Sequence, residues 1–307
     1  VNRLNPQKPL TGSYPVLFDE RVSASLIGHL TSAINGAAIS RGSSWLRESL
    51  NKRVLPESFN LSEDPTRPRI AGSRPFDAEG LPTSKKNFVE DGILKSLILD
   101  LRSARKLNLA PSGNAYRSLS SAPQPGPGNL ELSSDSKTVL DIIKKIKNGL
   151  FVTSLIGSTI NQNTGDYSRG ANGFWIQNGE ITYPVNECTI AGNLKEMLLN
   201  LTAANDGRKH LSRVIPSLLV ENMTGKLLRD FHGVVMSIPA LEAKIVEVKT
   251  SHEKHSVEDH LGALERWGFD PFDPEISEPT TSTDDEHIDG SDTQNYYKHE
   301  IDEFDEF

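Results

Sequence analysis

Residues 151–193 read FVTSLIGSTINQNTGDYSRGANGFWIQNGEITYPVNECTIAGN and contain the most informative local signals of the chain. Residues 151–156 and 173–177 are short runs rich in apolar, β-branched and aromatic side chains, which favour strands. Asn178-Gly179 separates the second run from residues 180–184, and both residues tolerate a positive φ. The stretch therefore predicts a hairpin with a tight turn at this pair.

Residues 163–173 precede the hairpin and are expected to form a loop with three glycines. Polar side chains on bendable backbone beside a rigid hairpin are a common place for function. The candidate site is therefore a peptide- or partner-facing loop made of Asp166, Tyr167, Ser168, Arg169 and Gly170. In the alternative, the glycines only form turns, and Asp166 pairs with Arg169 at the surface.

The run GDYSRGANGFWIQNGEITYPVNECTIAGNLKEM, residues 165–197, closely resembles the C-terminal region of the TldD/PmbA proteins, also called modulators of DNA gyrase. Further runs similar to PmbA-type sequences are found at residues 64–68, 73–77, 89–92, 100–104 and 126–129. The resemblance covers roughly residues 1–225, which we expect to form one domain, and it corresponds to the second half of the family's sequences. We therefore expect an N-terminal domain of the family to be missing from this sequence.

The resemblance implies a PmbA/TldE-type subunit of a cytoplasmic metallopeptidase. Such subunits form a heterodimer with a TldD-type catalytic subunit, and the family acts on unfolded or short peptides within an enclosed chamber. Zinc is expected in the TldD-type partner. This chain is expected to contain no cofactor, no catalytic residue and no metal site of its own.

The helix expected at residues 22–34 can be compared with the metal-binding helix of the TldD-type branch. Apolar residues recur at helical spacing between residues 22 and 34, and Asn35-Gly36 offers a stop. In the TldD-type branch the equivalent helix bears a His-Glu metal motif with a third ligand one turn on. Aligned through residues 41–44, those positions are Gly28, His29 and Ala33, and two of them have no ligand atom. His29 is expected to be a hydrogen-bonded structural histidine, and residues 205–209 lack the family's cysteine ligand.

Charge divides the chain into two parts. Residues 226–307 hold 7 Lys and Arg against 21 Asp and Glu, a net charge of −14, whereas the first 225 residues hold 26 against 20, a net charge of +6. An acidic segment of this kind is typical of a solvated tail, and we expect it to be disordered from about residue 251. The basic residues of the body are scattered without interleaved aromatics, so no nucleic-acid partner is expected. No apolar run reaches the 18 or so residues of a membrane span, so no membrane partner is expected.

The fold class predicted is α+β, mostly antiparallel sheet with packed amphipathic helices. Helices are expected at residues 101–107 after Asp100, at 194–203, and after Ser134-Asp135-Ser136 with a buried face that ends at Gly149. That face comprises Val139, Leu140, Ile142, Ile143 and Ile146. Residues 41–50 are expected to extend or restart a helix, and further strands are expected at 12–18, 129–132, 217–221 and on both sides of a turn at 90–92. The segment 63–81 is expected to be irregular, with Arg67, Arg69, Arg74, Asp77 and Glu79 in an ionic network or on a solvated rim.

Two rival functions stay open. One is an independently active hydrolase that uses Ser168 or Cys188 as its nucleophile, although the sequence shows no matching His-Asp set. The other is a non-enzymatic protein-binding modulator of gyrase or of toxin–antitoxin systems. His252-Glu253-Lys254-His255 looks like a metal motif, but its histidines are three residues apart rather than four, and no metal role is expected.

Overall fold

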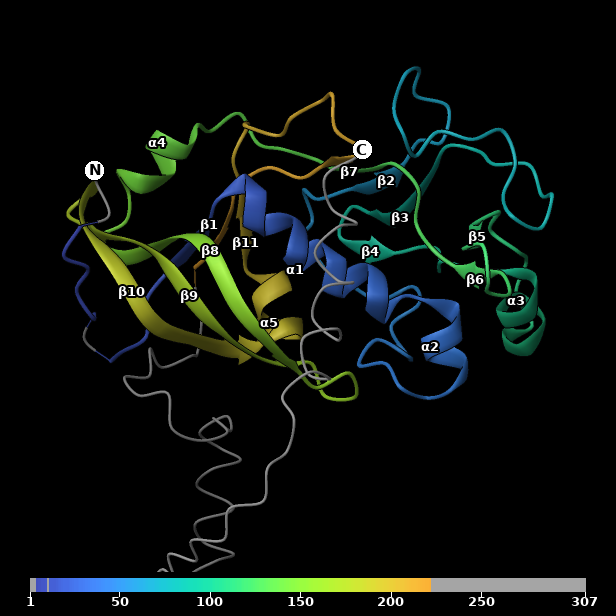
Figure 1. Ribbon diagram of the computed structural model, residues 1–307, viewed down its shortest axis with the longest axis horizontal. Coiled ribbons are helices and arrows are strands. Elements are labelled where there is room, and N and C mark those ends of the chain that lie inside the picture. The colour runs from blue at the N-terminus through green and yellow to red at the C-terminus, as the bar shows by residue number, and fades with distance from the viewer. Residues whose placement is uncertain (1–3, 10, 222–307) are drawn as a thin grey trace, which may run out of the picture. The chain divides into compact units, whose positions relative to one another are not determined.

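A computed structural model describes residues 4–9 and 11–221 of the chain. The charged tail and the motif at residues 252–255 lie outside the described residues. Most strands belong to two sheets, and most neighbouring strands are antiparallel (Figure 1). The α+β class is confirmed. None of the helices in the described part of the chain is long and apolar enough to cross a membrane.

The larger sheet has six strands in the order β10-β9-β8-β1-β13-β11. Their bounds are β1 Val16–Phe18, β8 Asn148–Ile160, β9 Asp166–Gln177, β10 Glu180–Asn193, β11 Leu201–Ala203 and β13 Leu218–Val220. The pair β1–β8 is parallel, which joins segments that are more than a hundred residues apart in the chain.

The second sheet has five strands in the order β12-β7-β2-β3-β4, and a separate ladder joins β5 and β6. Their bounds are β2 Leu61–Glu63, β3 Lys86–Glu90, β4 Ile93–Leu94, β5 Ala115–Tyr116, β6 Gln124–Pro125, β7 Leu130–Leu132 and β12 Arg213–Val214. The helices are α1 Glu20–Ala33, α2 Gly36–Ser40, α3 Leu101–Leu107, α4 Val139–Ile143 and α5 Leu194–Leu199.

The meander β8-β9-β10 forms the largest ladder of the described chain (Figure 1). Its turn is the predicted Asn178-Gly179 pair, with φ values of 52° and 83°. The strands run well beyond the predicted cores and contain 13, 12 and 14 residues. At Gly173 a Cβ atom would lie 1.9 Å from the carbonyl oxygen of Phe151, so the close approach of β8 and β9 requires glycine.

Helix α1 starts where the sequence predicts and packs against β8. Asp19 caps it by accepting a hydrogen bond from the backbone N–H of Arg21 at 3.1 Å. Leu26, Ile27 and Leu30 form its buried face and join the main core. Asn35 does more than stop this helix, because its side chain accepts the N–H groups of α2 and starts that helix.

Several predicted elements differ from the structure. Residues 41–50 form turns instead of helix. The helix after residue 134 is only α4, capped by Thr138, and Leu140 on it is exposed, whereas Ile142, Ile143 and Ile146 pack beside β1 and β13 as predicted. Gly149 lies within β8 instead of ending a helix. The helix predicted over 194–203 ends at Leu199, because residues 201–203 pair with β13.

Residues 63–81 are irregular after Glu63, as predicted. Arg69 is exposed and Arg67 and Arg74 are partly exposed, as a solvated rim requires, whereas the two acidic side chains bind backbone groups. Asp77 is buried and accepts backbone N–H groups from Glu79, Leu81 and Ala115. Glu79 accepts the N–H of Leu101 at 2.7 Å. These side chains therefore satisfy backbone groups of an irregular segment, which would otherwise be buried without partners.

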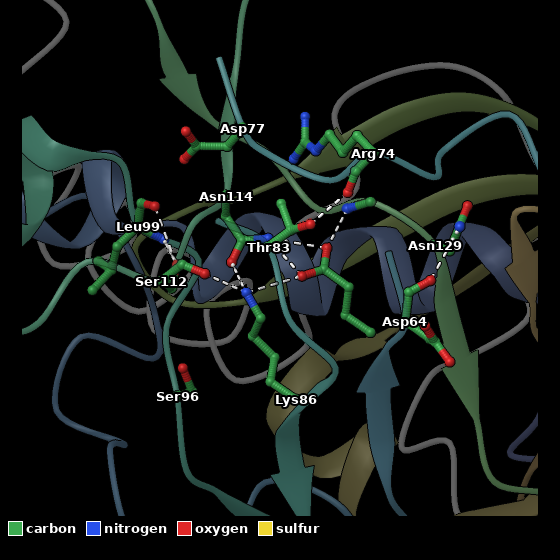
Figure 2. A network of polar contacts seen from close by, with 12 residues as sticks. Asp64, Arg74, Asp77, Thr83, Lys86, Ser96, Leu99, Ser112, Asn114 and Asn129 are labelled. Atoms are coloured by element: carbon green, nitrogen blue, oxygen red, sulfur yellow. Dashed lines mark hydrogen bonds and ion pairs between the residues drawn. The ribbon is translucent and has the colours of Figure 1, made fainter. Parts of the chain in front are cut away.

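A buried ionic network forms at a place that the sequence does not indicate. Glu63 accepts both a hydrogen bond from Asn114 at 2.7 Å and one from the N–H of Gly128, and it lies 3.3 Å from the ammonium of Lys86. Lys86 also donates to Asn114 and to the carbonyl of Ser112, as Figure 2 shows. The network joins β2 and β3 to the segment before β7, and all its charged groups have partners.

Candidate functional site

The expected loop at Asp166–Gly170 is a strand in the structure. Strand β9 already begins at Asp166, and it pairs with β10 on one side and β8 on the other. The loop before it is short, because the Asn161 side chain accepts the N–H groups of Asn163 and Thr164 and closes the turn. The structural part of that prediction is wrong.

Alternation along β9 places Tyr167 and Arg169 on one face of the sheet and Asp166, Ser168 and Gly170 on the other. Tyr167 is 2% exposed and belongs to the main core, so the expectation that these residues stay out of the core is wrong for Tyr167. Asp166, Ser168 and Arg169 are partly exposed, and Gly170 is buried. The structure thus buries Tyr167 and Gly170 and leaves the other three candidates partly accessible.

The side chains of Tyr167 and His29 meet between β9 and α1. Their ring centroids are 5.9 Å apart, and the planes cross at 70°, which is an edge-to-face contact. The Tyr167 hydroxyl and His29 Nε2 are both buried and have no hydrogen-bond partner in the described part of the chain. His29 was expected to be hydrogen-bonded, and at Nε2 it is not.

Burial sets the protonation of this pair. Burial, together with the positive charge of Arg169, lowers the pKa of His29 below its usual 6.5, so the imidazole is neutral at pH 7. Burial raises the pKa of Tyr167, against the opposing effect of Arg169, and the phenol stays protonated. The pair can therefore offer neutral hydrogen-bonding groups, not charges.

Arg169 does not pair with Asp166, as the alternative prediction had it, but binds Gly157. Its Nε donates to the carbonyl of Gly157 at 2.7 Å, and it forms no ion pair with Asp166. Asp166 instead accepts hydrogen bonds from Thr164 at 2.7 Å and Asn193 at 3.1 Å. Gly157 lies within β8 and has a φ of 66°. A glycine inside a strand pattern is the sequence signal that could have indicated this irregular position.

The two nucleophiles of the hydrolase alternative lie in unsuitable surroundings. Cys188 is 2% exposed, and its thiol donates to the carbonyl of Ala171 at 3.0 Å. Burial raises the pKa of this thiol to about 11, so the thiolate is scarce at neutral pH. The cross-strand neighbours of Ser168 are Ala191 and Thr159, neither of which is a base.

The residues on α1 do not fit a zinc site. A Cβ at Gly28 would meet nothing within 4 Å, and Ala33 is buried. Across residues 4–9 and 11–221, no three His, Cys, Asp or Glu side chains lie close enough together to hold a metal ion. In the stretch 205–209, Asp206 accepts the N–H and hydroxyl of Ser217, which is a structural role.

Sequence comparison identifies relatives across most of this chain. The family described as PmbA/TldA metallopeptidase C-terminal domain matches residues 11–226. Metalloprotease PmbA of Escherichia coli O157:H7 is 42% identical over 207 residues, 67% of this chain and 44% of that protein. The metalloprotease PmbA homolog of Haemophilus influenzae is 40% identical over 230 residues, 75% of this chain and 48% of that protein. The metalloprotease TldD homolog of Buchnera aphidicola is 27% identical over 212 residues, 67% of this chain and 43% of that protein.

Solved structures share the fold. A modulator of DNA gyrase from Bacteroides thetaiotaomicron has a TM-score of 0.67 and 30% identity, over 74% of this chain and 49% of its own. TldE from Thermococcus kodakarensis has the same TM-score at 23% identity, over 74% of this chain and 53% of its own. The chain spans about half the length of the relatives it matches. It belongs to the PmbA/TldA metallopeptidase family.

Proposed function

We propose that this chain is the PmbA/TldE-type, non-catalytic subunit of a metallopeptidase. In this proposal a TldD-type subunit forms a heterodimer with it and supplies zinc, and the complex degrades unfolded or short peptides in the cytoplasm. The proposal rests on one observation: helix α1 of this family member lacks the side chains that would bind zinc. Gly28 and Ala33 have no ligand atom, and His29 is packed edge-on against Tyr167. A catalytic zinc needs about three protein ligands and an open position.

Within the proposal, β9 presents its accessible residues to the peptide or to the partner. Asp166, Ser168 and Arg169 are partly exposed, while Tyr167 anchors the strand in the core. The Arg169 guanidinium donates from its Nε to Gly157, and its terminal nitrogens carry further N–H groups that suit a peptide carbonyl or a carboxylate. Arg169 is accordingly the side chain we assign to recognition.

The substitution Arg169→Ala tests this assignment. We expect about tenfold less cleavage of an unstructured peptide by the complex with a TldD-type partner, because one charge-assisted hydrogen bond is lost. Arg47→Ala is the control, since Arg47 is an exposed arginine that pairs only with its neighbour Glu48 at 3.3 Å. Unchanged activity of the folded Arg169→Ala protein, or an equal loss in the control, would remove Arg169 from the proposal.

A non-enzymatic modulator is the second candidate, because two solved relatives bear the name modulator of DNA gyrase. A peptidase subunit acts through cleavage of a peptide, whereas a non-enzymatic modulator acts without cleavage. If a gyrase supercoiling assay responds to the chain equally with and without a chelator that removes zinc but leaves Mg²⁺ in solution, and with no peptide cleaved, the modulator function is favoured. A response that disappears with the chelator favours the peptidase subunit.

A further inference from the structure

A cavity of about 250 Å³ lies between α2, α3 and residues 122–125. None of its lining residues belongs to α1 or β9, so it is separate from the site described above. Figure 1 shows α2, α3 and β6 as neighbours, and contacts join α2 both to α3 and to β6. Its charged lining consists of three cations, Arg41, Arg102 and Lys106, and one acid, Asp100.

The walls of this cavity are fixed to one another. At Gly36 a Cβ atom would lie 2.4 Å from Leu99 Cδ2 and 2.7 Å from Ser103 Oγ, so α2 approaches the start of α3 as closely as only glycine allows. Asn35 ties the third wall, because its Nδ2 donates to the carbonyl of Pro125 at 2.8 Å. The same side chain accepts the N–H of Ala37 and caps α2. A ligand therefore meets a cavity whose shape already exists, which lowers the entropic cost of binding.

The cations of the cavity lack acidic partners. Among the described residues, Arg41, Arg102 and Lys106 take part in none of the ion pairs that the structure contains. Asp100 is the single acid of the lining, and its carboxylate also accepts the N–H of Ser103 at 2.7 Å and caps α3. With three cations and one carboxylate, the lining has a formal charge of +2.

The positive charge of Arg102 does not stabilise α3. It lies in the first turn of the helix, where the macrodipole is positive and a cation is unfavourable. It also precedes Lys106 by four residues, and like charges at that spacing destabilise a helix. Lys106, in the last turn, is favourably placed for the dipole, but Arg102 is not. A bound anion would offset both costs.

We propose that this cavity binds one oxyanion group, a carboxylate or a phosphate. Two guanidinium groups and one ammonium group match either anion, and guanidinium binds both in a planar, bidentate fashion. The volume is below the roughly 300–1,000 Å³ of pockets for drug-sized ligands, so the cavity suits the anionic group and not a whole nucleotide. The two sources of such a group are the free C-terminus of a peptide and a phosphate. The proposal does not depend on the peptidase role.

Calorimetric titration of the full chain tests the proposal. The probes are inorganic phosphate, a short neutral peptide with a free C-terminal carboxylate, and the same peptide amidated. We expect saturable one-to-one binding of phosphate or of the free-carboxylate peptide, and none of the amide. Whichever probe binds identifies the source of the group.

Charge-neutralising variants show whether the binding takes place in this cavity. Arg102→Gln is expected to weaken binding about tenfold, as the loss of a charge-assisted hydrogen bond implies. Arg41→Gln, on the opposite wall, should do the same, which keeps the test valid if one variant folds poorly. Arg105→Gln is the matched control: it removes the same charge from α3, at a residue that does not line the cavity.

The expected pattern is a loss of affinity in the two cavity variants with less than about a twofold change in the control. Unfolding midpoints near that of the unmodified chain would show that the variants fold. The proposal is overturned if neither anionic probe gives saturable binding, if Arg105→Gln weakens binding as much as Arg102→Gln, or if both cavity variants bind as tightly as the unmodified chain.

Discussion

Tyr167 buries a hydroxyl that meets no hydrogen-bond partner within the described residues. A buried polar group without a partner costs about 1–3 kcal/mol relative to one that is satisfied. We therefore expect Tyr167→Phe to leave the free energy of unfolding unchanged or to raise it, because the ring and its contact with His29 are kept. Urea unfolding measures this effect.

The control for that substitution is Tyr116→Phe at a tyrosine that is 58% exposed, which should change stability by less than about 0.5 kcal/mol. If Tyr167→Phe instead lowers the stability by more than about 1 kcal/mol, the hydroxyl has a partner, and the description of the site is wrong.

The lowered pKa of His29 predicts a pH dependence of stability. The folded state binds the proton less tightly than the unfolded state, because of burial and of Arg169. Between the lowered pKa and the usual value of 6.5, the unfolded state therefore holds more protons. Stability from this group is complete above pH 6.5 and is lost as the pH falls through the folded pKa.

Urea unfolding at several pH values between 7.5 and 5, for the unmodified chain and for His29→Gln, checks this sign. The unmodified chain should lose more stability on acidification than the variant does. An equal or smaller loss in the unmodified chain would mean that His29 is not buried as a neutral imidazole.

At the scale of elements, the meander β8-β9-β10 depends on one glycine. A Cβ at Gly173 would lie 1.9 Å from a backbone oxygen, which cannot yield as a flexible side chain would. We expect Gly173→Ala to destabilise the protein by about 1–3 kcal/mol, the usual cost of overpacking. Gly28→Ala is the matched control: its site in α1 is open, and alanine should stabilise a helix interior there by about 0.5–1 kcal/mol. Thermal unfolding of both variants checks the pair, and a Gly173→Ala protein as stable as the parent would contradict the close approach of the strands.

The sequence predicted elements where a local signal decides the structure. Asn178-Gly179 forms its turn, and Asp100 caps a helix over Leu101–Leu107 as expected, because cap and turn chemistry act within a few residues. Residues 166–170 were predicted as a loop, because glycine-rich sequence has weak strand propensity, whereas pairing with strands on both sides overrides that propensity.

The candidate site was only partly predictable for the same reason. The resemblance pointed to α1 and to residues 166–170, and the structure brings His29 and Tyr167 from these two segments into contact. The contact itself, the Gly157 carbonyl that holds Arg169, and the buried Glu63–Lys86 pair arise from long-range packing. No local pattern in the sequence encodes such packing.

The whole chain combines membership of the PmbA/TldA metallopeptidase family with a helix α1 whose residues do not fit zinc. In the proposed function, proteolysis depends on a metal and on the complete assembly. Because the side chains of α1 do not fit zinc, we propose that another chain supplies the metal. A division of labour between two subunits reconciles these two observations.

The most direct measurement is the zinc content of the purified, dialysed chain, together with cleavage of an unstructured peptide in the presence and absence of a TldD-type partner. We expect less than stoichiometric zinc and no cleavage by the chain alone. With the partner we expect chelator-sensitive cleavage that His29→Ala does not abolish. Stoichiometric zinc bound to this chain, with chelator-sensitive cleavage in the absence of any partner, would contradict the account.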